Sequence, residues 1–169
     1  MADPADAGFR IRRAAEGDLE AMNRIYNWEV EHGVATWELD PWPLERRVEW
    51  FRARDHDEPV LVVESAGAVI GFGYLTKYRG RRGYRFTREN TVFIEPGYQR
   101  RGLGRALLAA LIAEARTLGL HALVAWIDAE NAGSIELHRA LGYELIGVER
   151  ETGHKFEQWR SSVEMQLLF

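Results

Sequence analysis

The chain has 169 residues, a length that predicts one domain, and its 46% apolar and 28% charged residues argue against a disordered chain. The net charge of −4 disfavours a general nucleic-acid binder, because such proteins usually carry a basic surplus. No cysteine is present, which excludes disulfides, zinc fingers and a thiol nucleophile and suits a cytoplasmic protein. No apolar run approaches the roughly 20 residues of a membrane span, so we expect no membrane partner.

The first half of the chain predicts a strand, two helices and a strand hairpin. Residues 1–8 are small and acidic without a signal-peptide pattern, and we expect a flexible segment there before a domain over 9–169. Alternating apolar and basic residues predict a strand over 9–13. Apolar residues at helical spacing predict helices over 18–31 and 43–54. Two apolar runs joined by Ala66-Gly67 predict a hairpin over 59–78.

The second half predicts a sheet completed by two helical crossovers. A basic loop, Arg79 to Arg85, separates the hairpin from the elements predicted over 89–94 (strand), 103–118 (helix), 122–127 (strand), 131–141 (helix) and 143–169 (two strands around a turn at Gly153). This order predicts an α+β domain with a mixed, mostly antiparallel twisted sheet flanked by helices.

A glycine-rich turn joins the strand ending at Ile94 to the long helix. A helix that begins directly after such a turn exposes unpaired backbone N–H groups and the positive end of its dipole. Gly102 and Gly104 remove side chains that would keep an anion away. Three arginines add positive charge: Arg100, Arg101 and Arg105. The stretch predicts a pyrophosphate site, although an ordinary turn beside surface arginines is equally open on these residues alone.

The sequence Gln99-Arg100-Arg101-Gly102-Leu103-Gly104 matches the signature of the GNAT acetyltransferase superfamily, and the chain resembles that family from about Phe9 to Leu167. Further segments resemble its phosphinothricin (methionine sulfoximine/sulfone) acetyltransferase branch. They are Tyr26-Asn27, Ala35-Thr36-Trp37-Glu38, Glu89 to Ile94, Leu137 to Tyr143, and Gly153-His154-Lys155-Phe156 with Trp159.

The resemblance implies acetyl-coenzyme A as cosubstrate and no metal. It places the diphosphate on the turn from Arg100 to Arg105, which includes Leu103, and the pantetheine arm beside Val92, Phe93 and Ile94. Backbone pairing suits an arm that contains amides. Asn131 matches the family asparagine that binds pantetheine, and it is equally suited to be a helix N-cap.

The resemblance also implies two proton-transfer residues. Glu89 matches the branch's proposed general base, with a cross-strand ion pair as the alternative. His138 occupies the position where many superfamily members carry a tyrosine that protonates the leaving thiolate. A histidine packed in the core is the alternative for His138, and Tyr143 is the reserve donor.

For the acceptor, the resemblance points to Arg82, Gly83 and Tyr84 in the basic loop, because arginine holds carboxylate or phosphinate groups bidentately. A solvated hairpin loop is the plain alternative. Trp37 lies in a loop that covers the acceptor site in the family.

We therefore expect an N-acetyltransferase that acts on the α-amine of a small substrate bearing an acidic group, by direct attack in a ternary complex. Acetylation of peptide N-termini or polyamines, a non-catalytic coenzyme A-binding module, and an RNA-contacting protein remain alternatives. Nucleic acid is not an expected partner, and the branch is usually homodimeric.

Overall fold

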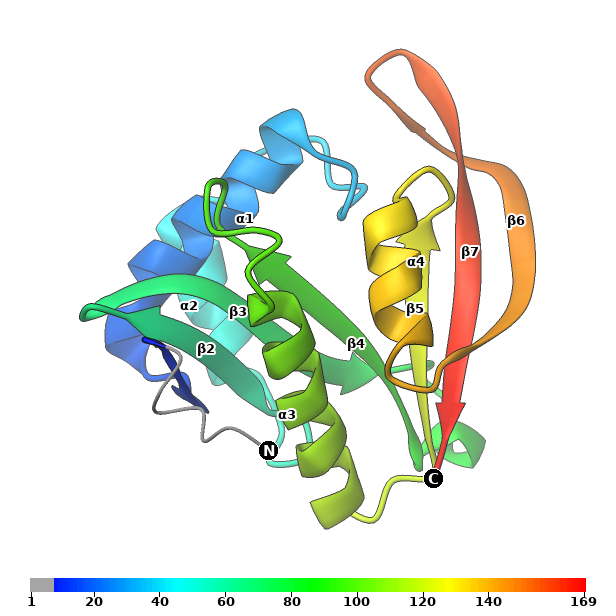
Figure 1. Cartoon of the computed structure of the whole chain (residues 1–169), viewed down its shortest axis with the longest axis horizontal. Coiled ribbons are helices and arrows are strands. Elements are labelled where there is room, and N and C mark those ends of the chain that lie inside the picture. The colour runs from blue at the N-terminus through cyan, green and yellow to red at the C-terminus, as the bar shows by residue number, and fades with distance from the viewer. Residues whose placement is uncertain (1–7) are drawn as a thin grey trace.

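Seven strands form one sheet in the order β1-β2-β3-β4-β5-β7-β6 in the computed structural model, which describes residues 8–169 (Figure 1). The strands are β1 (Arg10–Arg13), β2 (Val60–Ser65), β3 (Ala68–Lys77), β4 (Thr87–Ile94), β5 (Ala122–Asp128), β6 (Glu144–Lys155) and β7 (Gln158–Leu168). The helices are η2 (Glu16–Asp18), α1 (Leu19–His32), α2 (Leu44–Arg52), η3 (Arg82–Tyr84), α3 (Leu103–Thr117) and α4 (Ala132–Arg139). The predicted α+β class and mostly antiparallel sheet are confirmed.

Helices cover both faces of the sheet. Side chains along β2 point alternately to the two faces of the sheet. Leu61 and Val63 pack into the core under α3, and Val60 and Val62 pack into the core under α1. Val62 and Val63 are both fully buried, which explains why this strand reads as a continuous apolar run. The α3 core also takes up apolar side chains of α4.

Among the described strands, only β4 and β5 pair in parallel, and their pairing is short. It covers Thr87 to Glu89 on β4, after which the two strands diverge, while β4 stays paired with β3 as far as Ile94. Figure 1 shows the strands side by side near the C-terminus and separating toward the opposite end. The α3 crossover joins these two strands. The divergence leaves one edge of β4 open beyond Glu89.

The hairpin of β6 and β7 turns at a different place from the predicted one. Gly153 lies within β6, and the turn is made by Phe156 and Glu157, with φ of 54° and 56°. A two-residue hairpin turn of this kind needs positive φ at both central residues, and here non-glycine residues adopt it. The prediction of a turn at Gly153 was wrong because this glycine serves a contact with Trp37 instead.

The chain begins, in the described part, at Gly8, whose carbonyl accepts a hydrogen bond from the Ser65 hydroxyl at 2.8 Å. The expected flexible segment over 1–8 otherwise lies outside the described residues. No helix within residues 8–169 is long and apolar enough to cross a membrane.

Candidate functional site

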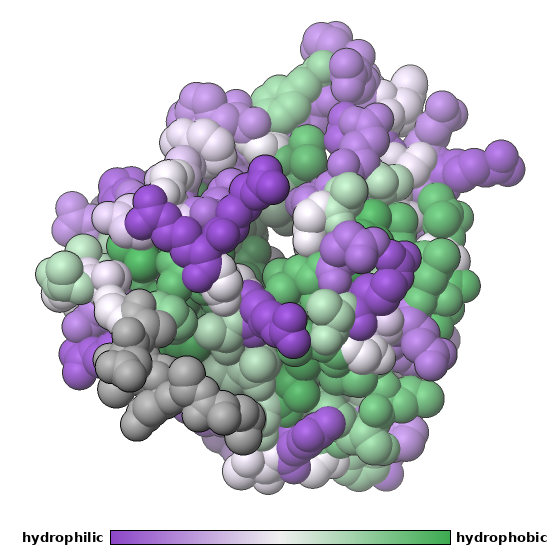
Figure 2. Space-filling model, in the orientation of Figure 1, coloured by the Kyte–Doolittle hydropathy of each residue, from purple (hydrophilic) through white to green (hydrophobic). Residues whose placement is uncertain are grey.

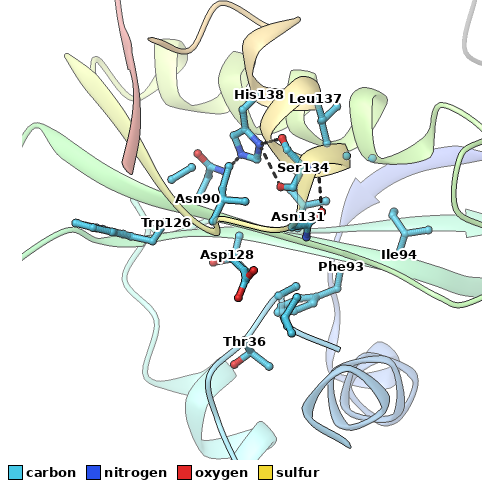
Figure 3. Close-up of a pocket in the computed structure, with 18 of the residues that line it drawn as sticks. Thr36, Asn90, Phe93, Ile94, Trp126, Asp128, Asn131, Ser134, Leu137 and His138 are labelled. Atoms are coloured by element: carbon cyan, nitrogen blue, oxygen red, sulfur yellow. Dashed lines mark hydrogen bonds between the residues drawn. The ribbon is translucent and has the colours of Figure 1, made fainter. Parts of the chain in front are cut away.

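A cleft of about 800 Å³ occupies the gap between the diverging strands. Its walls come from β4 (Glu89 to Ile94), β5 (Ala125 to Asp128), the turn before α3, α4 (from Gly133 to His138) and the loop after α1. Figure 2 shows the molecule hollowed near the centre of the face seen in Figure 1, with hydrophilic groups around the rim. In Figure 3, side chains of β4, β5 and α4 surround this hollow.

At one end of the cleft lies the glycine-rich turn. Gly102 caps α3 with a φ of 81°, a left-handed conformation that favours glycine, and its carbonyl accepts the N–H of Ala106. The N–H groups of the first helical turn have no partner within the helix and present partial positive charge. Five residues of this turn line the cleft: Gln99, Arg100, Gly102, Gly104 and Arg105.

Two of the residues predicted for this turn have other surroundings. The Leu103 side chain is buried in the core under α3, and the Arg101 guanidinium lies 5.3 Å from the centre of the Tyr98 ring. Neither lines the cleft. Leu103 therefore offers only its backbone to a ligand at this turn.

The open edge of β4 forms the middle of the cleft, and Val92, Phe93 and Ile94 all line it. The Phe93 side chain is buried against Phe72 and Tyr26, with ring centres 5.1 and 5.5 Å apart. What the strand offers a ligand here is mainly its backbone. An extended amide-containing group can pair with such an edge as an added strand.

Glu89 stands where the two strands separate and also lines the cleft. Burial raises the pKa of its carboxyl above the ordinary value of 4.5. Among the described residues it has no ion pair, so the alternative of a cross-strand ion pair finds no partner. A half-buried, unpaired carboxylate with a raised pKa suits a general base.

His138, on α4, belongs to a chain of buried hydrogen bonds. Its Nδ1 lies 2.8 Å from the carbonyl oxygen of Ser134, and its Nε2 lies 2.9 Å from the side-chain nitrogen of Asn90 (Figure 3). A carbonyl only accepts, so Nδ1 carries the proton and Nε2 accepts from the amide. The Tyr143 hydroxyl donates to Oδ1 of Asn90 at 2.7 Å. Every polar atom in this chain of side chains has a partner.

The expected role of His138 as a proton donor to the thiolate stays a prediction. Burial lowers the pKa of His138, which favours the neutral ring, and in this network Nε2 accepts a hydrogen bond from the Asn90 amide. Tyr143, the reserve donor, is 2% exposed, and burial raises its pKa. The geometry supports a positioning role for both residues through Asn90.

Asn131 lies where either of the roles considered for it is possible. Its side-chain oxygen accepts the backbone N–H of Ser134 at 3.1 Å, which caps α4, and the residue also lines the cleft. The cap interpretation is confirmed. A ligand contact stays a prediction.

Sequence reasoning missed several cleft residues, chiefly Asn90, Trp126 and Asp128. The Asp128 carboxylate is buried and makes two hydrogen bonds of 2.7 Å to the Arg160 guanidinium. Two signals were available: Asn90 lies in the middle of a strand, and Asp128 ends an otherwise apolar strand. Buried polar side chains need partners, so such positions point to a polar network.

The described chain matches the sequence profile of the Acetyltransferase (GNAT) family over residues 22–143. The chain belongs to this acetyltransferase family. An L-methionine sulfoximine/L-methionine sulfone acetyltransferase of Salmonella typhimurium is 40% identical over 158 residues, covering 93% of this chain and 92% of the relative.

Solved GNAT structures agree with this assignment. A phosphinothricin acetyltransferase from Sinorhizobium meliloti in complex with acetyl-CoA superposes with a TM-score of 0.93 and is 34% identical, covering 96% of this chain and 89% of that one. A ribosomal-protein-alanine N-acetyltransferase from Brucella melitensis superposes with a TM-score of 0.92 at 40% identity, covering 95% of this chain and 99% of that one.

Within this GNAT fold, the residues predicted to bind the acceptor are separated. Trp37 lines the cleft, whereas Arg82, Gly83 and Tyr84 form η3 before β4 and do not line it. Tyr84 packs edge-on against Tyr78 with 5.5 Å between ring centres. The structure thus brings together Glu89, Trp37 and the β4 edge, whereas Arg82, Gly83 and Tyr84 of the basic loop lie outside the cleft.

Proposed function

We propose that this GNAT enzyme transfers the acetyl group of acetyl-CoA to the α-amine of a small amino-acid-like acceptor of the phosphinothricin, methionine sulfoximine or methionine sulfone type. One observation carries the proposal. A single cleft contains the glycine-rich start of α3, the open edge of β4 and the unpaired carboxylate of Glu89. The names of the Salmonella and Sinorhizobium relatives support the choice of acceptor.

The cleft residues fit acetyl-CoA, which supplies an activated acetyl thioester. Gly102, in its left-handed conformation, and the helix N–H groups beyond it suit the diphosphate, and Arg100 and Arg105 add charge from the lining. Arg101 adds to the positive field of the same turn. Val92, Phe93 and Ile94 offer backbone groups for the pantetheine amides, and Asn131 lines the same cleft.

Glu89 removes the proton that the α-amine must lose before it attacks. An α-amino group has a pKa near 8, so at neutral pH most of it is protonated and needs a base. A carboxylate with a raised pKa accepts that proton directly or through one water. Backbone N–H groups of the open β4 edge polarise the thioester carbonyl. No cysteine is present, in agreement with direct attack in a ternary complex.

For the acidic group of the acceptor, we keep Arg82, Gly83 and Tyr84 as the proposal. The bidentate binding of acidic groups by arginine and the family resemblance support this proposal. The position of the three residues outside the cleft counts against it. Arg82→Ala is expected to raise the KM for the acceptor at an unchanged KM for acetyl-CoA. An unchanged KM for the acceptor would show that the basic loop does not bind the acceptor.

We also propose a homodimer in the cytoplasm. The sheet ends at β6, an edge strand with three side chains more than half exposed: Leu145, Ile146 and Val148. Long apolar edges are prone to pair with another chain. Light scattering on the purified protein tests the dimer. A mass of one chain at micromolar concentration would contradict it.

Steady-state release of free thiol from acetyl-CoA tests the proposed activity. The acceptor panel contains methionine sulfone, methionine sulfoximine, phosphinothricin, plain L-amino acids, a polyamine and an N-terminal peptide. Saturable turnover on the sulfone-like acids supports the proposal. Turnover on none of these acceptors, with intact acetyl-CoA binding, would instead indicate a binding module.

Acetylation of a protein N-terminus is the second candidate. The Brucella neighbour, named as a ribosomal-protein-alanine N-acetyltransferase, favours it. Turnover on the peptide alone would select this function and leave the cosubstrate site unchanged.

A further inference from the structure

The loop after α1 lines the cleft and is attached to its surroundings at several points, one of them a hydrogen bond of 3.4 Å between the hydroxyls of Tyr26 and Thr36. Val34, Ala35, Thr36 and Trp37 all line the cleft. The Glu29 carboxylate, at the end of α1, accepts the backbone N–H of Ala35 at 2.7 Å. Both of these attachments are local in sequence. Two more come from the tip of the β6–β7 hairpin, more than a hundred residues away.

The first distant attachment is an ammonium group. Lys155 is only 3% exposed, yet among the described residues its Nζ has no carboxylate partner. It donates instead to the carbonyl oxygen of Thr36 at 2.9 Å and to that of Glu29 at 3.3 Å. Glu29 lies in the last turn of α1, where a positive charge stabilises the helix dipole. Burial lowers the pKa of Lys155, and the charge of the nearby Glu29 carboxylate offsets part of this shift.

The second distant attachment is steric. A Cβ atom added to Gly153 would lie 2.2 Å from two carbons of the Trp37 ring, so the indole rests directly on the Gly153 backbone. The φ of Gly153 is outside the left-handed region, so backbone conformation does not require glycine here. The contact with Trp37 is therefore the reason for this glycine, and it fixes where the indole lies.

From these contacts we infer that Lys155 is a positioning residue for the acceptor end of the cleft. Its ammonium group holds the Thr36–Trp37 segment against the hairpin tip, where the Trp37 indole packs on Gly153. The inference rests on the proposed function for its kinetic consequence. Its structural part, a loop held by the hairpin, stands independently. Glu89 and this loop line the same cleft, so a loose loop weakens acceptor binding and leaves the glycine-rich turn intact.

Lys155→Met tests the inference, because methionine keeps the length and apolar stem of the side chain and removes its charge. Lys77→Met is the matched control, since Lys77 is the other lysine of the chain and pairs with Asp55 on the surface. We expect Lys155→Met to raise the KM for the acceptor at least about tenfold. The KM for acetyl-CoA should change less than about twofold, and Lys77→Met should change neither.

Hydrogen exchange supplies a readout that does not depend on activity. In Lys155→Met, the amides of residues 33–38 should exchange at least about tenfold faster, with α3 unchanged. Unchanged exchange of 33–38 together with an unchanged KM for the acceptor would overturn the inference. So would equal acceleration in α3, because that would indicate a general loss of stability.

Gly153→Ala provides a second variant that leaves the lysine in place. It should displace the indole and raise the same KM. If Lys155→Met does not fold, an unchanged KM for the acceptor in Gly153→Ala would overturn the inference. If the wild-type protein acetylates nothing, the proposed function fails, and the exchange of residues 33–38 in either variant still decides whether the hairpin holds the loop.

Discussion

The Nε2 atom of His138 lies 2.9 Å from the side-chain nitrogen of Asn90, and this contact links α4 to the open strand β4. Because Nδ1 of the same ring donates to the Ser134 carbonyl, the imidazole can be an acceptor only at Nε2. Tyr143 completes the chain by donating to the other end of the Asn90 amide. The relationship fixes the tautomer of His138 and holds β4 in place where it borders the cleft.

A pH-dependent stability follows from the buried neutral ring. The unfolded chain binds a proton near pH 6.5, whereas the folded ring, with its lowered pKa, resists it, so stability falls as pH decreases below 6.5. Between pH 7.5 and 5.5, His138→Gln should reduce the loss of unfolding free energy by at most about 1.4 kcal/mol. Urea denaturation at the two pH values measures this. Equal losses in the two proteins would contradict a neutral buried His138.

The glycine-rich turn predicts a contrast between two neighbouring glycines. Gly102→Ala forces a left-handed residue and should cost about 1–2 kcal/mol of stability while raising the KM for acetyl-CoA. Gly104→Ala is the control for stability. Its added Cβ would meet Leu137 at 3.5 Å and Ile94 at 3.8 Å, which are ordinary contacts, and helical alanine is favoured. Urea unfolding and acetyl-CoA titration separate the two effects. Equal destabilisation would contradict the conformational argument.

The buried pair of Asp128 and Arg160 should matter more than any surface pair. Asp128→Asn removes the buried partner of Arg160, which keeps its ion pair with the exposed Glu130, and is expected to cost about 1–3 kcal/mol. Arg10→Ala is the control, because Arg10 is 68% exposed and pairs with Glu64 at the surface, where such pairs contribute less than about 1 kcal/mol. Thermal unfolding compares them. A small loss for Asp128→Asn would indicate that the pair is solvated.

Glu89→Gln should be no less stable than the wild-type protein at pH 7. The folded pKa of Glu89 is raised by burial, so ionisation of this carboxyl costs stability as pH rises through that pKa. Glutamine carries no such charge. Urea denaturation at pH 7 and at pH 4 measures the difference, which should shrink at the lower pH. A strongly destabilised variant would show that Glu89 makes a structural contact.

The spacing of apolar residues and the positions of glycine and proline were sufficient to predict the order of the helices and strands. The stripe of leucines in α3 and the breaker after Ile94 located the long crossover. The hairpin turn could not be predicted in the same way. Gly153 is the usual signal for a turn, but the space it leaves is filled by Trp37, a contact across more than a hundred residues.

The candidate site was predictable where a motif is local and unpredictable where pairing depends on the fold. The glycine-rich turn and the β4 strand lie next to each other in sequence, and both line the cleft. The protonation of His138 could not be inferred, because it depends on Asn90, 48 residues away. Likewise, Lys155 belongs to a segment that resembles the family, but its burial could not be predicted, since its partners are backbone carbonyls far away in sequence.

The central claim is that Glu89 deprotonates the acceptor amine in the cleft between β4 and β5. The most direct measurement is kcat/KM for the acceptor across pH 5 to 9 in the wild-type protein and in Glu89→Gln, at saturating acetyl-CoA. The ratio of the two proteins at each pH cancels the titration of the acceptor itself. At pH values above the raised pKa of Glu89, we predict a kcat/KM about 10²–10⁴-fold lower in the variant than in the wild-type protein. The difference should decrease as the pH falls below that pKa. A constant ratio near one over this range would contradict the claim.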